Sequence, residues 1–597
     1  MTFFRAVVAS LPLLALSAPA PAEPPYPHAV LSTSQGLVVS SETHASEAGA
    51  EILRRGGNAV DAAVATGLAL AVTYPWAGNL GGGGFMLIHL AGGRDVALDF
   101  RETAPAAATR TMYLGPDGGV LTGDDSSTAG WRASGVPGTV AGFALALEKY
   151  GSGRVTWAEV VEPARRLAAE GHRLSAAAAR RLQDHREFLG RCAETKRVYL
   201  GDGEAPRPGE LRVLPDLAAT LARLQRDGPR EFYEGETARR IAADMAAHHG
   251  TLTLDDLRGY RPVERVPVRG TYRGFEVVAM PPPSSGGIGL LQMLGMLEPF
   301  AVAAHGRDSA ENVHLFVEVM RRAYRDRAVF LGDPDFVALP VAGLLDRTYL
   351  AGRMRGFDPQ RATPSADLAA GRPADAAPAA TALPRRESTE TTHYSIVDAA
   401  GNAAAVTYTL NGGYGSGVTI AGTGVLLNNE MDDFTAKPGA PNAYGLLQGE
   451  ANAIAPGKRP LSSMTPTFVF GPDRRLLLVT GSPGGATIIT TVLEVVTNVI
   501  DHRLPVGEAV AAPRFHHQWM PDVIHYEPDG LAPAVLEDLR IRGHTLAIHA
   551  IYQDAADPAR RDRYLQGDAE TIWIDPVSHL RLGAADPRQP DARAVAQ

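Results

Sequence analysis

The apolar positions of the chain predict helices and strands that differ in how deeply they are buried. Residues 59–71, AVDAAVATGLALA, are almost wholly apolar, which predicts a helix buried on several sides. Residues 85–90 and 96–100 are short apolar runs separated by turn residues, and they predict a hairpin of buried strands. Residues 311–330 have the helical period with arginines and acids interleaved, which predicts an amphipathic helix with a solvated charged face.

A second hairpin follows a long stretch that has no periodicity. Residues 357–390 are rich in Ala, Pro and charge, which predicts a mobile connector. A structureless run of this length inside a compact protein calls for a functional explanation. Strands are predicted at 392–398 and 403–410, and the two-residue period places Thr409 and Asn411 on one face.

Composition and charge narrow the class of protein. The 597 residues are 45% hydrophobic and 21% charged, with a mean hydropathy of −0.08, which is typical of a globular protein. The net charge of −9 argues against a dedicated nucleic-acid binder, which usually carries a basic surplus. Cys192 is the only cysteine, so an internal disulfide framework and a site with several thiolate ligands are excluded.

The first residues have the pattern of a secretory signal peptide. Arg5 supplies a positive charge, residues 6–16 form a short apolar run, and Ala20-Pro-Ala22 offers small residues for cleavage before Glu23. We therefore expect a signal peptide at 1–22 and a periplasmic or secreted protein. No later segment approaches the ~18 apolar residues of a membrane span, so none is expected in the mature chain.

Several common catalytic motifs are absent. The sequence contains neither the GxxxxGK[ST] phosphate loop nor a GxSxG nucleophile elbow. His314 and Glu318 have the i, i+4 spacing of metal ligands, but no HExxH pattern completes the set. His516 and His517 are interpreted as packing or hydrogen-bonding residues.

Polar clusters in the last third of the chain suggest a binding site. Acidic residues at 430–433 suit an ammonium group, Arg459 with the serines at 462–463 suits a carboxylate, and the paired glycines at 484–485 suit an oxyanion. The glycines here and at 81–84 could equally make tight turns. From spacing alone, an amino-acid site beside an acyl-transfer centre and a set of scattered surface turns both remain open.

Nine motifs spread over the mature chain resemble those of the γ-glutamyltransferase family, also called γ-glutamyl transpeptidase or glutathione hydrolase. In chain order they are AGNLGGGGF (77–85), DFRE (99–102), SGVPG (134–138), PPSSGG (282–287), TTHYSIVD (391–398), VTYTLN (406–411), LNNEMDD (427–433), KRPLSS (458–463) and GSPGG (481–485). The resemblance implies an α+β fold, a four-layer αββα sandwich of the N-terminal-nucleophile hydrolase type.

The resemblance also implies a precursor that cleaves itself. The Thr391 hydroxyl would attack the Glu390 carbonyl, and hydrolysis of the ester would leave a large subunit, 23–390, and a small subunit, 391–597, as a heterodimer. The connector at 357–390 would then move away from the site. Thr391 would be the nucleophile, with its own α-amine as the base.

Further site residues are implied by their matches to the family motifs. Thr409 would hydrogen-bond the nucleophile, and Gly484 and Gly485 would donate N–H groups to the oxyanion. Arg101, Ser462 and Ser463 would bind the carboxylate of the γ-glutamyl group. Its ammonium would be bound by Asn411, Glu430 and Asp433. Residues 438–449 resemble a lid loop in which Tyr444 would be the gate.

The implied reaction cleaves the γ-glutamyl amide of glutathione and transfers the acyl group to water or to an amino-acid or peptide acceptor. The resemblance implies that neither a metal nor an organic cofactor is needed. Two departures affect specificity: Glu430 stands where many bacterial relatives carry Gln, and Gly412-Gly413 replace bulkier residues. One alternative is a glutaryl or cephalosporin acylase of the same fold, and the ammonium-binding acids argue against it. The other is a non-catalytic protein that binds γ-glutamyl peptides, against which the intact Thr391 argues.

Overall fold

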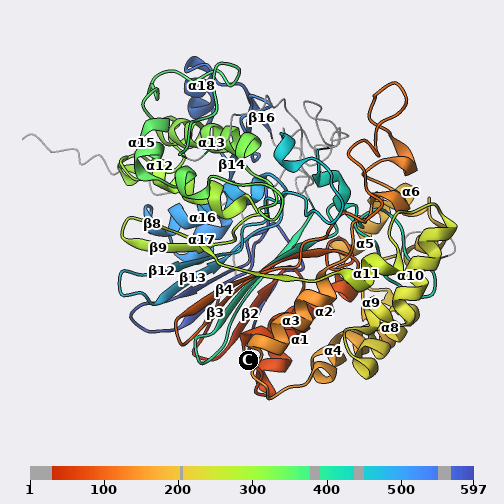
Figure 1. Ribbon diagram of the computed structural model, residues 1–597. Helices are drawn as coiled ribbons and strands as arrows, with labels where there is room; N and C mark the ends of the chain where they lie inside the picture. Colours follow the sequence, from red (N-terminus) through yellow and green to blue (C-terminus); the bar gives the residue numbers. More distant parts are fainter. Residues whose placement is uncertain (1–29, 202–205, 375, 377–389, 436–448, 549–565) are drawn as a thin grey trace, which may run out of the picture.

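Two seven-stranded sheets lie face to face at the centre of the protein, and helices cover their outer faces (Figure 1). The computed structural model describes residues 30–201, 206–374, 376, 390–435, 449–548 and 566–597. Sheet 1 has the order β19 (Arg593–Ala596), β2 (Leu37–Ser40), β10 (Thr392–Val397), β11 (Ala403–Thr409), β3 (Gly83–Leu90), β4 (Arg94–Asp99) and β7 (Val263–Arg265). Sheet 2 has the order β1 (Val30–Thr33), β18 (Arg581–Ala584), β17 (Thr571–Ile574), β13 (Leu476–Thr480), β12 (Thr467–Phe470), β9 (Phe275–Ala279) and β8 (Val268–Tyr272).

Each sheet is covered by its own group of helices. Against sheet 1 pack α1 (Thr43–Arg54), α2 (Ala59–Thr73) and α3 (Thr139–Tyr150), with α4 (Trp157–Glu170) packed on α2. Against sheet 2 pack α12 (Gly286–Leu297), α16 (Thr487–Ile500) and α17 (Val506–Ala511), with α13 (Ala310–Phe330) outside α12. The result is a four-layer αββα sandwich.

Smaller elements lie around these layers. The remaining helices are α5 (Ala176–Asp184), α6 (Arg186–Leu189), α7 (Ala193–Tyr199), α8 (Pro215–Asp227), α9 (Glu231–Glu234), α10 (Glu236–Ala247), α11 (Leu254–Gly259), α14 (Val341–Leu344), α15 (Arg347–Arg353) and α18 (Pro533–Ile541). Two small sheets pair β5 (His172–Arg173) with β6 (Leu211–Arg212), and β15 (Ile524–Tyr526) with both β14 (Phe515–His516) and β16 (Leu546–Ile548).

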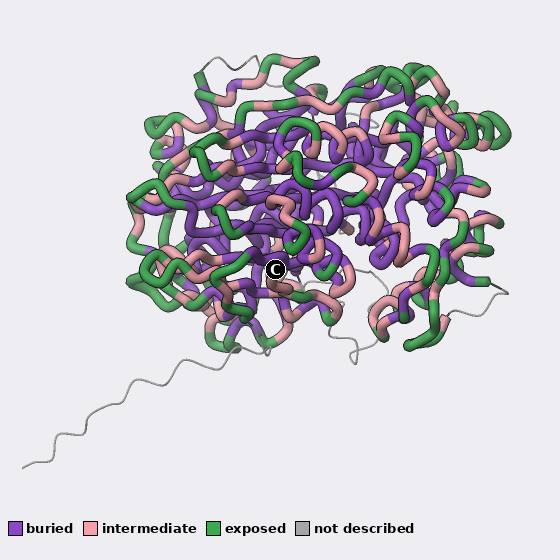
Figure 2. Tube along the Cα trace, turned by 90° about the horizontal axis from the view of Figure 1, so that it is seen from below, coloured by how far each residue is buried: buried purple, intermediate pink, exposed green. Residues whose placement is uncertain are grey.

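The strands of sheet 1 are apolar on both faces because both faces are covered. Leu37 and Val39 face sheet 2, whereas Val38 between them packs with the helices. Phe85 and Met86 divide in the same way on β3. Side chains alternate between the two faces of a strand, so a continuous apolar run is what a central layer requires. Figure 2 shows the buried chain concentrated in the interior.

The structure confirms three of the elements predicted from periodicity. Helix α2 is buried along its whole length, and Asn58 begins it with a capping box to Asp61. Both predicted hairpins exist, β3 with β4 and β10 with β11, each antiparallel.

The solvated face predicted for residues 311–330 is wrong. Arg321, Arg322 and Arg327 of α13 are only 1–2% exposed. Glu318 forms buried ion pairs with Arg321 and Arg322. The charged residues that suggested a solvated face therefore compensate one another inside the protein.

The segment predicted as a mobile connector covers α13. Residues 357–374 contain no helix or strand, but Thr363 donates its N–H to Glu318 at 3.0 Å and Gly371 donates to Asp326 at 2.9 Å. Residues 375 and 377–389 lie outside the described part of the chain. So do the predicted signal peptide and the predicted lid residue Tyr444.

No helix in the described part of the chain is long and apolar enough to cross a membrane.

Candidate active site

Thr391 directly precedes β10 and lines a pocket at the end of sheet 1, with about 250 Å³ of empty space when its opening to solvent is included. Most of the residues predicted for the site meet there although they come from distant parts of the sequence. The lining residues are Arg101, Thr391, Thr409, Asn411, Glu430, Asp433, Ser462, Ser463, Met464, Gly485 and Ile488. The pocket therefore contains a hydroxyl nucleophile candidate, an ion cluster and a glycine turn.

Thr409 contacts the peptide bond that self-cleavage would break. Its Oγ1 donates to the carbonyl oxygen of Glu390 at 2.7 Å and accepts the N–H of Asn411 at 2.8 Å. Asn411 has φ of 75°, a left-handed conformation that turns its N–H back onto Thr409. With its acceptor side occupied, the Thr409 hydroxyl is oriented to polarise the carbonyl beside Thr391. In the uncleaved chain Thr409 thus bonds Glu390, not the Thr391 hydroxyl.

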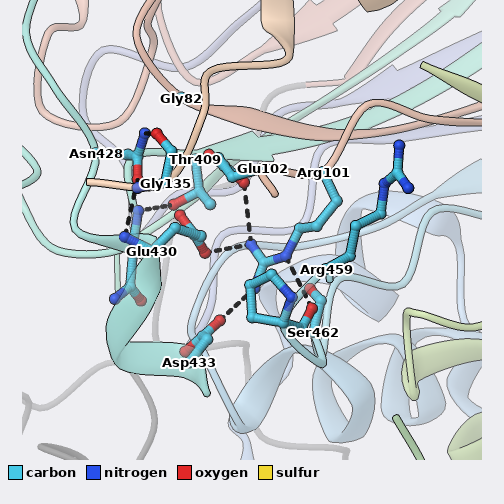
Figure 3. Close-up of polar contacts among 12 residues, drawn as sticks. Gly82, Arg101, Glu102, Gly135, Thr409, Asn428, Glu430, Asp433, Arg459 and Ser462 are labelled. Atoms are coloured by element: carbon cyan, nitrogen blue, oxygen red, sulfur yellow. Dashed lines mark hydrogen bonds and ion pairs between the residues drawn. The ribbon is translucent and has the colours of Figure 1, made fainter. Parts of the chain in front are cut away.

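Arg101 lies at the centre of a buried ion cluster just beyond β4. Its guanidinium donates to Glu430 through one nitrogen and to Asp433 through another, and Glu102 lies 3.7 Å away (Figure 3). Arg101 is 1% exposed, and its Nε donates to the Pro460 carbonyl at 3.3 Å. The cluster holds three carboxyl groups against one guanidinium.

Burial and mutual repulsion raise the pKa of two acids in this cluster. Burial raises the pKa of Glu102 to about 7, and Asp433 adds to that rise. Burial also raises the pKa of Glu430 well above its usual range. Oε2 of Glu430 and Oδ1 of Asp433 have no hydrogen-bond partner among the described residues. These buried acceptors favour a ligand that brings N–H donors and positive charge.

Asn428 fixes the position of Glu430. Its Oδ1 accepts the N–H groups of Glu430 and of Gly135, and its Nδ2 donates to the carbonyls of Gly81 and Gly135 (Figure 3). Residues 430–433 form a short 3₁₀ helix that begins at this point. Asn411 donates to the carbonyl of Asn429 at 3.0 Å, which joins the strand end to the acidic segment.

Ser462 and Ser463 also line the pocket. Ser462 is held by backbone bonds to the 283–285 loop, and its Oγ accepts the N–H of Met464 at 3.1 Å. Ser463 Oγ accepts from Nη2 of Arg327 at 3.1 Å, and Arg327 also donates to Ser285 at 2.7 Å. Arg327 and Glu102 are site residues that the sequence reasoning missed. Nothing in the helical period of 311–330 distinguishes Arg327 from a surface arginine.

Gly484 and Gly485 form a tight turn that leads into α16. Their φ angles are 125° and 58°, and a Cβ on Gly484 would lie 2.4 Å from Oγ1 of Thr487. The N–H groups of both glycines lack partners within the described residues. Free N–H groups before a helix N-terminus suit a developing oxyanion.

The glycine run 81–84 serves close packing of backbone. A Cβ on Gly82 would lie 2.1 Å from the Thr409 carbonyl oxygen, and one on Gly84 would lie 2.5 Å from the Thr407 carbonyl oxygen. Only glycine lets this segment lie so close to β11 beside the pocket.

The structure adds His544 to the pair His314 and Glu318 that had the spacing of metal ligands. His314 Nδ1 lies 2.7 Å from Nε2 of His544, and its other ring nitrogen bonds the Asp358 carbonyl. Glu318 is occupied by two arginines and Thr363. Guanidinium groups beside the carboxylate repel a cation, so the arrangement favours a hydrogen-bonded histidine pair. His516 and His517 also form hydrogen bonds, to Thr490 and Asp522.

Comparison with known proteins identifies the family. A sequence model described as Gamma-glutamyltranspeptidase matches residues 45–596. The chain is 45% identical over 583 residues to the glutathione hydrolase proenzyme of Escherichia coli strain K12, covering 96% of this chain and 95% of that protein. This chain belongs to the gamma-glutamyltranspeptidase family.

Solved structures of relatives agree with the architecture. A cephalosporin acylase from Bacillus halodurans superposes with a TM-score of 0.80 at 26% identity, covering 98% of this chain and 99% of that one. A gamma-glutamyltranspeptidase from Helicobacter pylori gives a TM-score of 0.54 at 42% identity, covering 55% of this chain and 94% of that one. The predicted fold, an α+β sandwich of the N-terminal-nucleophile hydrolase type, is confirmed.

Proposed function

We propose that this protein is a self-processing γ-glutamyltransferase that cleaves glutathione and related γ-glutamyl amides. The observation that carries the proposal is the ion cluster of Arg101, Glu430 and Asp433 beside Thr391 in one pocket. An α-amino acid head group carries one carboxylate and one ammonium, which match the guanidinium and the surplus carboxyl groups of this cluster. Family membership supports the same reaction class.

Self-processing begins at the Glu390–Thr391 bond. Thr391 Oγ1 attacks the Glu390 carbonyl carbon while Thr409 stabilises the carbonyl oxygen, to which it already donates at 2.7 Å. The C–N bond breaks, the ester that results is hydrolysed, and the α-amine of Thr391 becomes free. The products are a large subunit, 23–390 after export, and a small subunit, 391–597, which remain associated because sheet 1 contains strands of both.

Donor binding exchanges partners within the ion cluster. The donor α-carboxylate takes part of the Arg101 guanidinium, with the Ser462 and Ser463 hydroxyls beside it. The ammonium meets Asn411, Glu430 and Asp433, where buried acceptor atoms already lie. Each guanidinium–carboxylate pair that opens is replaced by a pair with the ligand, so charge stays compensated.

Acyl transfer then uses Thr391 and the turn of Gly484 and Gly485. The Thr391 α-amine takes the proton of Oγ1 as the hydroxyl attacks the γ-carbonyl carbon of the donor. The N–H groups of Gly484 and Gly485 bind the oxyanion, a contribution of ~3–4 kcal/mol per donor at comparable sites. The amide nitrogen leaves with a proton, and water or an acceptor amine releases the acyl group from Thr391. No metal or organic cofactor takes part in this scheme.

An acylase for glutaryl or cephalosporin side chains is the competing assignment, favoured by the structural likeness to such an enzyme. A glutaryl group has a carboxylate and no ammonium. It would add a negative charge to a cluster that already holds three carboxyl groups. The charge balance of the pocket therefore favours the γ-glutamyl donor.

The test compares release of an aniline from a γ-glutamyl anilide and from the matching glutaryl anilide, with glutathione as a third donor. We expect the γ-glutamyl compounds to be used and the Thr391→Ala variant to be inactive on all three. Preference for the glutaryl compound would overturn the assignment. We further propose, from the signal-like residues 1–22, that the enzyme works in the periplasm or outside the cell.

A further inference from the structure

Residues 567–570 are linked by hydrogen bonds to two parts of the candidate active site, the start of β10 after Thr391 and the turn that holds Gly484 and Gly485. This segment, Gly-Asp-Ala-Glu, directly precedes β17 of sheet 2 and has no part in the proposed chemistry. Asp568 is 6% exposed, so its carboxylate is effectively removed from solvent. Burying a carboxylate costs free energy unless hydrogen bonds or ion pairs compensate it, so the partners of Asp568 are informative.

The first of these parts is the start of β10, which directly follows Thr391. Ser41, just after β2, donates its hydroxyl to Oδ2 of Asp568 at 2.8 Å. Thr392 in turn donates its hydroxyl to Ser41 at 3.2 Å. Thr392 is the residue after Thr391, so the first residue of β10 is connected to Asp568 through a single buried serine.

The second part is the turn of Gly484 and Gly485, the proposed oxyanion donors. The N–H of Asp568 donates to Oγ of Ser482 at 2.9 Å, and Ser482 donates to the Pro483 carbonyl at 2.7 Å. These two residues directly precede Gly484. The turn is thus fixed by the same residue that holds the nucleophile strand.

Gly567 allows this close contact. Its φ is 69°, and a Cβ there would lie 2.6 Å from Ser482 Oγ and 2.7 Å from Thr491 Oγ1. On the far side, Ser395 of β10 donates to the Glu570 carbonyl at 2.6 Å. Sheet 1 and sheet 2 are therefore joined by polar contacts at the end where Thr391 lies.

We propose that Asp568 is a positioning residue that holds Thr391 and the Gly484-Gly485 turn at their working separation. The inference rests on the proposed acyl-transfer function. Asp568 touches neither Arg101 nor the acidic segment 430–433, so head-group binding is independent of it. Its loss moves the nucleophile relative to the oxyanion donors, and small errors of that kind reduce the rate of the chemical step strongly.

The experiment measures chemistry and binding separately. Asp568→Ala and Ser41→Ala each break the side-chain bond between residues 41 and 568, and both keep the backbone N–H of residue 568 that bonds Ser482, whereas Asp568→Asn also retains the acceptor oxygen for Ser41. Asp61→Asn is the matched control, because Asp61 is a fully buried carboxylate that caps α2 near the opposite end of β10. For each variant, kcat/KM on a γ-glutamyl anilide, the inhibition constant of L-glutamate and the fraction of cleaved chain are recorded.

We expect kcat/KM to fall about tenfold in Asp568→Ala, with the L-glutamate constant changed less than twofold and most of the rate recovered in Asp568→Asn. Slower self-cleavage at an unchanged melting temperature also supports the proposal, since cleavage uses the same strand. If Asp568→Ala does not fold, Ser41→Ala must show the same split. Unchanged kcat/KM, or equal loss of rate and of L-glutamate binding, would refute it. A wild type inactive on every γ-glutamyl donor would refute the proposed function instead.

Discussion

Replacing Glu430 by Gln tests the ammonium site with almost no change in shape. Glu430 is 1% exposed, one of its oxygens accepts from Arg101, and the other has no hydrogen-bond partner among the described residues. Gln preserves the volume and one acceptor but removes the negative charge.

The size of the effect follows from the bond that changes. A hydrogen bond to a charged group contributes roughly 1.5–3 kcal/mol, and a neutral one roughly 0.5–1.5 kcal/mol. The midpoints of these ranges differ by about 1.3 kcal/mol, which corresponds to a roughly tenfold loss of kcat/KM for a γ-glutamyl donor. The folded protein should not be destabilised, because a Gln at 430 avoids the cost of burying a carboxylate and relieves its repulsion with Glu102 and Asp433.

The assay is the initial rate of aniline release by wild type and Glu430→Gln, with γ-glutamyl and glutaryl anilides compared on the same preparations. Only the γ-glutamyl compound has an ammonium, so the glutaryl rate is the internal control. We expect the γ-glutamyl preference to fall about tenfold. An equal loss on both compounds would show that Glu430 does not bind the ammonium.

Three further perturbations address the other parts of the site. Gly484→Ala places a Cβ 2.4 Å from Thr487 Oγ1, so kcat should fall by about 10–100-fold, and an unchanged kcat would remove the turn from the mechanism. Thr409→Val removes the donor to the Glu390 carbonyl and should slow self-cleavage about tenfold on denaturing gels, whereas Thr409→Ser should not; equal rates in both would contradict the role. Glu102→Gln should stabilise the protein at pH 8 by up to about 3 kcal/mol and not at pH 4, measured by denaturant unfolding. The pKa of Glu102 rises from 4.5 to about 7 on folding, so its unfavourable contribution grows as pH rises through that window, and equal effects at both pH values would contradict the shift.

The fold was predictable from sequence where local patterns suffice. Full burial of α2 follows from its unbroken apolar run, and both hairpins follow from short apolar segments with turns between them. The pairing of β2 with both β10 and β19 was not predictable, because these strands lie hundreds of residues apart. Register between distant strands depends on tertiary packing that no local period encodes.

The sequence predicted which residues line the pocket better than it predicted the contacts among them. Family motifs named the residues that meet in the pocket, but they did not reveal that Arg101 is already paired with Glu430 and Asp433. Arg327 was misplaced on a solvated face, because a helical period shows which residues share a face and not what covers it. Glu102 received no role because its effect arises only from nearby buried carboxyl groups.

The central claim is that Thr391 becomes an N-terminal nucleophile, and intact mass with N-terminal sequencing of the purified protein tests it most directly. The account predicts two chains in the wild type, the smaller beginning at Thr391 and ending at Gln597, and a single chain in Thr391→Ala. A folded wild type that remains one chain, or a cleavage at another bond, would contradict it.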